Sequence, residues 1–499
     1  MELFTAQLHP GRALGFLVLG ASLHDILSRL KAEPQRFPNI DVLYSPDTPL
    51  AEPVCVALPH NGIRLRFDAP EQRLRLVEVV DFAKNHITFK EKDLVRPSAD
   101  APTPPAGPTF RHIYQRLLGP TYAGEFIPPA ADQEDGTYVL SYPGVAFNFP
   151  MAEAEYSPTK DVVTLLSPSA NQSATSMAVF SGESWADARE TLWTEILPSI
   201  NSSPALPRTK DVHADEVSLV RIHGGGRVQL FRKWTNESFW IQLGETTPQD
   251  LVLELGPPSA MYRKNDQKMI VHKMRTTSGT ATRPNMGDLA RKDEAIDTDH
   301  SSMNDVSDQS DDDDDEPSAS SPSGECFYNY FYLGFDILLS TPVSPSQAPP
   351  GADMPLENGI KMHQPDRLVA TKIVLHGNIP GSYEFNRHRR CRWEIAYLGD
   401  GTGATSANSE AVFKDVEDQL HTKWGPAEPN NPQARQRGMV LNRGWGDSPG
   451  NSCELLGGWE DSAARKAEAS IDSTTTLYGF PGLVFEVLRN GYINTVTVF

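Results

Sequence analysis

The residues best suited to chemistry gather in one short segment near position 390. Its arginines and histidine lie within six residues of a chain whose formal net charge is −20: Arg387, His388, Arg389, Arg390 and Arg392. The guanidinium fork matches phosphate and carboxylate groups, so this arginine segment could bind a phosphoinositide headgroup or an acidic stretch of a partner. The alternative is a solvated strand whose arginines pair with carboxylates of the same chain.

The residues around the arginine segment alternate in a way that is typical of a strand. Read so, one face carries Tyr383, Phe385, Cys391 and Trp393 with Arg387 and Arg389. The opposite face carries His388, Arg390 and Arg392.

Known catalytic motifs are absent from the sequence. It contains no nucleophile elbow, no phosphate-binding P-loop, no zinc-binding HExxH pair and no dinucleotide fingerprint. The 13 histidines are scattered. We therefore predict a non-enzymatic protein without catalytic, cofactor-binding or metal-binding residues. An enzyme of unrecognised class stays open, and it would need titratable groups to converge from separate units, for example around His376 or His388.

The charge and the cysteine content limit the partners and the cellular compartment that we expect for this protein. Residues 293–316 hold 12 of the acidic residues and no Lys or Arg, so the rest of the chain is only mildly acidic. That balance argues against duplex nucleic acid as the main partner. The four cysteines have no metal-binding spacing and favour a reducing, cytoplasmic setting. No segment approaches the length of a membrane span.

Four glycines precede the predicted strands that would have to position any functional site. Gly62, Gly144, Gly334 and Gly482 are each followed by apolar residues at alternate positions, which predicts a turn and then a half-buried strand. A short amphipathic helix precedes each strand, and three of these helices stop at a Gly-Pro pair that begins with Gly119, Gly256 or Gly425.

This recurring unit predicts an α+β fold in which helix-plus-hairpin units pack as antiparallel sheets with helices on one face. The expected units are residues 1–100, 101–242 with extra strands, 243–400 and 401–499. The third unit is interrupted by an acidic insertion, 276–325, predicted to be disordered, and by a loop at 341–364. The fourth contains a polar loop at 428–473.

Framework motifs along most of the chain resemble the phagosome assembly factor 1 family. They include the stretches 62–69, 329–331, 374–376 and 485–487. The resemblance implies a cytoplasmic autophagy factor without enzyme activity. It also implies a complex with a WD-repeat β-propeller protein, of the breast carcinoma amplified sequence 3 type, at the phagophore assembly site (the preautophagosomal structure).

The resemblance leaves two uses for the arginine segment. In this family, phosphoinositide contact is credited to the propeller, so the arginines could face the propeller instead. The other possibility is peripheral membrane association, in which the arginine segment itself binds anionic lipid.

Overall fold

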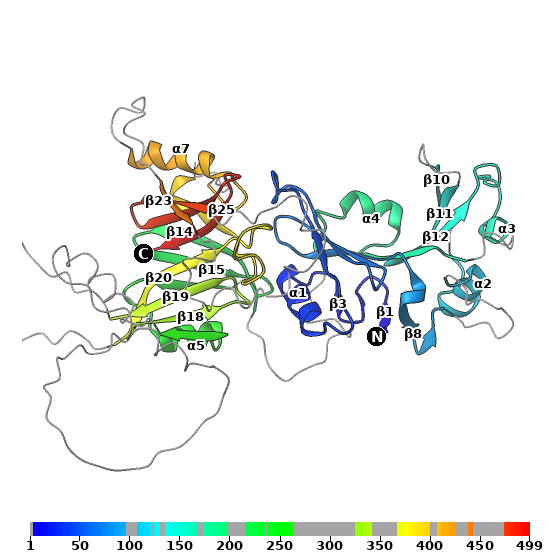
Figure 1. The fold of residues 1–499 in the computed structure, drawn as a ribbon, viewed down its shortest axis with the longest axis horizontal. Coiled ribbons are helices and arrows are strands. Elements are labelled where there is room, and N and C mark those ends of the chain that lie inside the picture. Colours follow the sequence, from blue (N-terminus) through cyan, green and yellow to red (C-terminus); the bar gives the residue numbers. More distant parts are fainter. Residues whose placement is uncertain are drawn as a thin grey trace, which may run out of the picture.

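The computed structural model describes most of the chain, in two lobes that lie side by side (Figure 1). The described residues are 3–95, 107–121, 124–129, 135–166, 173–197, 215–235, 237–263, 325–341, 367–399, 407–425, 438–442 and 474–499. The core of the first lobe runs from Phe4 to Val179, and that of the second from Val220 to Val498. All but the last residue of the expected insertion at 276–325, and all but the first residue of the expected loop at 341–364, lie outside these residues.

The main sheet of the first lobe has eight strands in the order β10-β11-β12-β13-β7-β6-β5-β4. They are β4 (Asp41–Leu43), β5 (Val54–Leu58), β6 (Ile63–Phe67), β7 (Leu74–Val79), β10 (Glu125–Ile127), β11 (Gly136–Tyr142), β12 (Val145–Met151) and β13 (Ser176–Val179). Each half of the sheet is an antiparallel meander of four consecutive strands, and the last strands of the two meanders, β7 and β13, pair antiparallel at the centre.

The main sheet of the second lobe follows the same plan, in the order β17-β18-β19-β20-β25-β24-β23-β22. Its strands are β17 (Ala260–Arg263), β18 (Cys326–Tyr330), β19 (Phe335–Ser340), β20 (Val369–His376), β22 (Met439–Asn442), β23 (Thr474–Phe480), β24 (Leu483–Leu488) and β25 (Ile493–Val498). Here β20 and β25 are the last strands of their meanders, and they pair antiparallel.

Each lobe carries a smaller second sheet. In the first lobe the order is β3-β2-β1-β8-β9, with β1 (Phe4–His9), β2 (Ala13–Leu14), β3 (Leu17–Val18), β8 (Asn85–Phe89) and β9 (Lys92–Asp93). In the second it is β16-β15-β14-β21, with β14 (Val217–Gly224), β15 (Arg227–Arg232), β16 (Ser238–Gln242) and β21 (Trp393–Ile395). The β1–β8 and β14–β21 pairs are parallel, so the sheets are not wholly antiparallel.

Short helices accompany the sheets. They are α1 (Leu23–Ala32), α2 (Phe110–His112) continuing into a π-helical turn (Ile113–Leu117), α3 (Val162–Leu166), α4 (Trp185–Thr191), α5 (Pro248–Leu255) and α7 (Phe413–Trp424), with 3₁₀ turns at Phe82–Lys84 and Ala396–Leu398. Ser22 caps α1 by accepting a hydrogen bond from the Asp25 amide. Figure 1 shows α5 beside β18 and α7 beside β23, at opposite ends of the second lobe. No helix of the described segments is long and apolar enough to cross a membrane.

The glycines predicted to precede strands or to end helices occupy those positions in the structure. Strands β6, β12, β19 and β24 begin directly after Gly62, Gly144, Gly334 and Gly482, all of which have positive φ. The π-helical turn ends two residues before Gly119, and Gly256 and Gly425 follow the last residues of α5 and α7.

Two boundaries differ from the prediction. The strands within 217–242 were assigned to the second unit, yet Val220, Leu230 and Ile241 pack into the core of the second lobe, because β14 pairs with β21. The predicted polar loop at 428–473 contains strand β22, whose four residues pair with β23. The rest of that loop lies outside the described residues.

Candidate functional site

The arginine segment lies between the lobes, in the connection from β20 to β21, and it is not a strand. Successive turns occupy residues 380–387, and Asn386 has a φ of 66°, which an extended strand does not allow. The Asn386 amide donates to the side-chain oxygen of Asn378 at 2.7 Å and fixes this path. The strand prediction for 383–392 was therefore wrong, and regular pairing starts only at Trp393.

Arg389 makes ion pairs with both lobes. Its guanidinium contacts Asp25 of helix α1 and, at 3.2 Å, Glu216, which precedes β14. The second oxygen of Glu216 makes an ion pair with Arg73 of the first lobe at 2.8 Å. Burial raises the pKa of Glu216, but Arg73 and Arg389 outweigh it and hold that pKa below its usual value. One carboxylate is thus shared by an arginine from each lobe.

Arg390 is a buried hydrogen-bond donor whose side chain is 1% exposed. Its nitrogens donate to the carbonyl oxygens of Pro70 at 2.7 Å, Gly377 at 2.6 Å and Ser409 at 3.0 Å. Pro70 belongs to the first lobe and the other two to the second. The fork geometry of the guanidinium is what allows one side chain to serve three carbonyls from separate segments.

A third group of charges surrounds Glu71 of the first lobe. Lys233 contacts it at 2.7 Å and Arg392 at 3.3 Å, and Arg392 also contacts Glu410 at 2.8 Å. Nearby, the Gln72 side-chain amide donates across the lobes to the main-chain carbonyl of Asn378, and the Asn378 side-chain amide donates to the Gln72 side-chain oxygen. We call these contacts together the seam. They are the contacts of Arg389, Arg390 and Arg392, those of the Glu216 and Glu71 carboxylates, and the Gln72–Asn378 pair.

The predicted binding residues therefore divide by exposure. Arg390 is buried, Arg389 is 11% exposed, both are engaged within the chain, and His388 is 2% exposed. Arg387 and Arg392 keep 34% and 33% of their side chains exposed. The structure places the carboxylate partners of these arginines within the chain itself, and binding of an outside anion or partner by the arginine segment stays a prediction.

A second cluster lies beside the seam in the second lobe. His376, at the end of β20, and His388 stack with ring centroids 3.6 Å apart. The Nε2 atom of each ring lies 3.0 Å from a different oxygen of Asp336 on β19. All three residues are buried, and their ligand-type atoms lie within 4.8 Å of one another, a grouping that could hold a metal ion.

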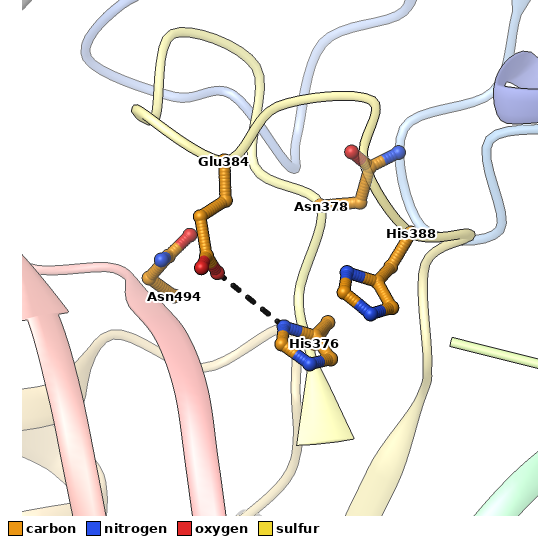
Figure 2. Close-up of a pocket in the computed structure, with 5 residues that line it drawn as sticks. All are labelled: His376, Asn378, Glu384, His388 and Asn494. Atoms are coloured by element: carbon orange, nitrogen blue, oxygen red, sulfur yellow. Dashed lines mark ion pairs between the residues drawn. The ribbon is translucent and has the colours of Figure 1, made fainter. Parts of the chain in front are cut away.

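Glu384 completes this cluster from the turn that precedes His388. Figure 2 shows its carboxylate paired with His376, where the Nδ1–Oε2 distance is 3.4 Å. Burial alone would lower the pKa of His376, but the bonds to Asp336 and Glu384 raise it to about 9. Burial and the neighbouring charge of His376 lower the pKa of His388 to about 4. The neighbouring carboxylates thus favour the charged form of His376, while burial beside that ring favours the neutral form of His388.

Sequence reasoning found only part of this cluster. It named His376 and His388 as places where titratable groups could converge, but it missed Asp336 and Glu384 and predicted no metal-binding residues. The β19–β20 register pairs Asp336 with Val374, which puts His376 diagonally beside Asp336 on the same face. This strand register was the signal that could have placed His376 beside Asp336. The return of His388 to the same place depends on the turns at 380–387, which the sequence pattern did not reveal.

Comparison with known proteins gives consistent matches along the chain. The family model described as "Phagosome assembly factor 1" matches residues 13–286 and 360–499. A PHAF1 protein of Arabidopsis thaliana is 24% identical, covering 99% of this chain and 92% of the relative. PHAF1 proteins of Drosophila melanogaster and Caenorhabditis elegans are each 21% identical, covering 97% of this chain and 90% of the relative. No solved structure matches.

Proposed function

Because the chain belongs to the phagosome assembly factor 1 family, we propose that it acts in phagosome assembly and autophagy as a non-enzymatic adaptor. In this role it forms a complex with a WD-repeat β-propeller protein and reaches the phagophore assembly site with it. The observation that carries the proposal is the similarity to PHAF1 proteins over nearly the full length of both chains.

The structure supports an adaptor in two ways. The seam bonds the lobes through several mostly buried ion pairs and amide contacts, so they can present surfaces to a partner as one body. Exposed apolar side chains also occur on the strands at both ends of the second lobe's main sheet. They are Met261 and Tyr262 on β17 and Met439 and Val440 on β22. Edge strands with exposed apolar side chains are typical of protein docking sites.

The test is a tagged pull-down of the full chain from starved cells, with mass spectrometry of the recovered proteins. We expect a WD-repeat propeller in near-equal amount. Recovery of the intact, abundant chain without a propeller would contradict the adaptor proposal.

Charge substitutions on the exposed edges would then map the interface. We expect Tyr262→Glu or Val440→Glu to reduce propeller recovery while thermal stability stays unchanged, because both side chains are largely exposed. Leu43→Glu, at an exposed apolar position on the edge strand β4 of the first lobe's main sheet, is the matched control for an added charge at a sheet edge. If all three variants recover the propeller equally, the docking surface lies elsewhere.

Direct binding of anionic membranes by the arginine segment is the alternative, and flotation of the isolated chain with phosphoinositide-containing liposomes separates it from the adaptor role. Arg387 and Arg392 are the members with exposed side chains. Flotation that Arg387→Ala abolishes in a folded variant would favour the membrane alternative. An absence of flotation, with propeller binding intact, would favour the adaptor.

A further inference from the structure

The cluster of His376, His388 and Asp336 has the composition of a metal centre. Two imidazole nitrogens and one carboxylate meet in a buried place, each from a different segment of the chain. We propose that these three residues bind one divalent transition-metal ion, with Zn²⁺ as the first ion to test. This inference goes beyond the adaptor role and does not depend on it.

The positions of the ligand atoms fit such an ion. In a tetrahedral zinc site with bonds of about 2.0–2.2 Å, neighbouring ligand atoms lie roughly 3.3 Å apart. Here each histidine Nε2 lies 3.0 Å from an oxygen of Asp336. Because the two rings are stacked within 6° of parallel, they would have to turn apart for both Nε2 lone pairs to point at one ion. Three protein ligands leave a further position for water or another small group.

Glu384 supplies the outer contact that metal-bound histidines usually make. Its Oε2 lies 3.4 Å from Nδ1 of His376 (Figure 2). The Nε2 atom of the same ring faces Asp336 instead. A carboxylate at Nδ1 fixes the ring so that Nε2 carries the lone pair for the metal. Arg387 pairs with the other Glu384 oxygen at 3.8 Å and helps to hold this carboxylate.

The two rings share the single carboxylate of Asp336. Both rings are buried and stacked face to face at 3.6 Å, which disfavours a positive charge on the two together. A metal ion would replace the proton between each Nε2 and Asp336 and would bond all three residues at once. Since His388 directly precedes Arg389, the ion would also anchor the segment that reaches Asp25 and Glu216 in the seam.

The test uses the purified full chain, stripped of metal with a chelator and titrated with Zn²⁺ in a competitive assay. We expect one Zn²⁺ to bind in the wild type and to raise the midpoint of thermal unfolding. Asp336→Asn and His388→Ala should each lose this ion and the zinc-dependent shift. His112→Ala removes a buried histidine of the first lobe, bonded to the Asp93 carbonyl, and should retain both.

The Glu384→Gln variant tests whether the Glu384 carboxylate supports metal binding or only the fold. Loss of an outer carboxylate typically weakens metal affinity by about 10–100-fold without changing the number of ions bound. We expect that result here, and equal affinity for wild type and Glu384→Gln would contradict the proposed geometry.

A spectroscopic measurement on the wild type keeps the proposal testable if the cluster variants do not fold. Co²⁺ added to the metal-free chain should give visible absorption bands of a low-coordinate histidine site, and one equivalent of Zn²⁺ should remove them. The proposal is overturned if the wild type gives no such bands and no zinc-dependent shift in stability. It is also overturned if folded Asp336→Asn binds the same ion.

Discussion

Gln72 and Asn378, one from each lobe, hold each other by reciprocal hydrogen bonds. The Gln72 amide nitrogen donates to the Asn378 carbonyl at 2.8 Å, and the Asn378 amide nitrogen donates to the Gln72 side-chain oxygen at 2.7 Å. Both residues are buried, and both have positive φ, 53° and 46°. Two strained backbone positions are thus kept in register across the seam by the side chains they carry.

We predict that this amide pair couples the lobes. Gln72→Ala leaves the buried Asn378 amide without its partner and should lower the free energy of unfolding by about 1–3 kcal/mol. Gln72→Gly is the matched control, because it removes the same side chain but adopts the positive φ without strain. Urea unfolding of these variants, of Asn378→Ala and of the double variant Gln72→Ala with Asn378→Ala gives the coupling energy. Additive effects of the two substitutions would contradict a direct coupling.

Glu216 should be more important to stability than an exposed carboxylate. Its side chain is 16% exposed and bridges Arg73 and Arg389, so Glu216→Gln leaves two mostly buried cations partly unpaired. We expect a loss of about 3 kcal/mol, typical of breaking a buried pair. Glu78→Gln, which breaks the more exposed pair with Arg66, should lose less than about 1 kcal/mol. Equal shifts in the urea midpoint would contradict this assignment.

Acid should weaken the seam. In the folded chain the pKa values of Glu71, Glu216 and Glu410 lie below the ordinary 4.5, because the attraction of neighbouring cations outweighs burial. A lowered pKa stabilises the fold at every pH above 4.5, and this contribution is lost as the pH falls from about 5 through the folded values. The midpoint temperature of thermal unfolding should therefore decrease as the pH is lowered below about 5.

The Glu216→Gln variant checks the cause of this acid sensitivity. Arg73, Arg389 and Lys233 surround the Glu216 carboxylate. Since the variant no longer has a group that titrates between them, its thermal midpoint should fall less steeply with acid than that of the wild type. Parallel curves would assign the acid sensitivity to other carboxylates.

Arg390 should not tolerate lysine. A lysine has no fork with which to reach the carbonyls of Pro70, Gly377 and Ser409 together, so at least one buried acceptor loses its donor. We expect Arg390→Lys to lower the free energy of unfolding by about 3 kcal/mol. Arg387→Lys, at a partly exposed arginine paired only weakly with Glu384, should change it by less than about 1 kcal/mol. Thermal unfolding of the two purified variants tests whether Arg390→Lys is the more destabilising substitution.

Gly334 and Gly482 should differ in their response to alanine. Both have positive φ, 87° and 75°, so both substitutions strain the backbone by about 1–2 kcal/mol. A Cβ at Gly334 would also collide with the Arg389 carbonyl, whereas at Gly482 the nearest atom is 3.4 Å away. Gly334→Ala should therefore be the more destabilising in urea unfolding. The opposite order would show that the β18–β19 turn can move away from the arginine segment.

The sequence predicted local elements better than long-range partners. Leu23, Ile26, Leu27 and Leu30 stand at helical spacing after Ser22, and they form the buried face of α1. Such periodicity is a property of neighbouring residues. That Arg389 meets Asp25, or His388 meets Asp336, depends on how the lobes and turns bring together residues 364 and 52 positions apart. The charges were visible in the sequence, but their partners were not.

The joining of each main sheet at the last strands of its two meanders sets the order in which the chain can fold during synthesis. Strand β7 is made about a hundred residues before its partner β13, and β20 is made about as long before β25. Until then, each growing chain exposes the open edge of a half-finished sheet, which invites pairing with other chains. Each main sheet therefore leaves the ribosome as an unfinished half, and its open edge is covered only when the closing strand emerges.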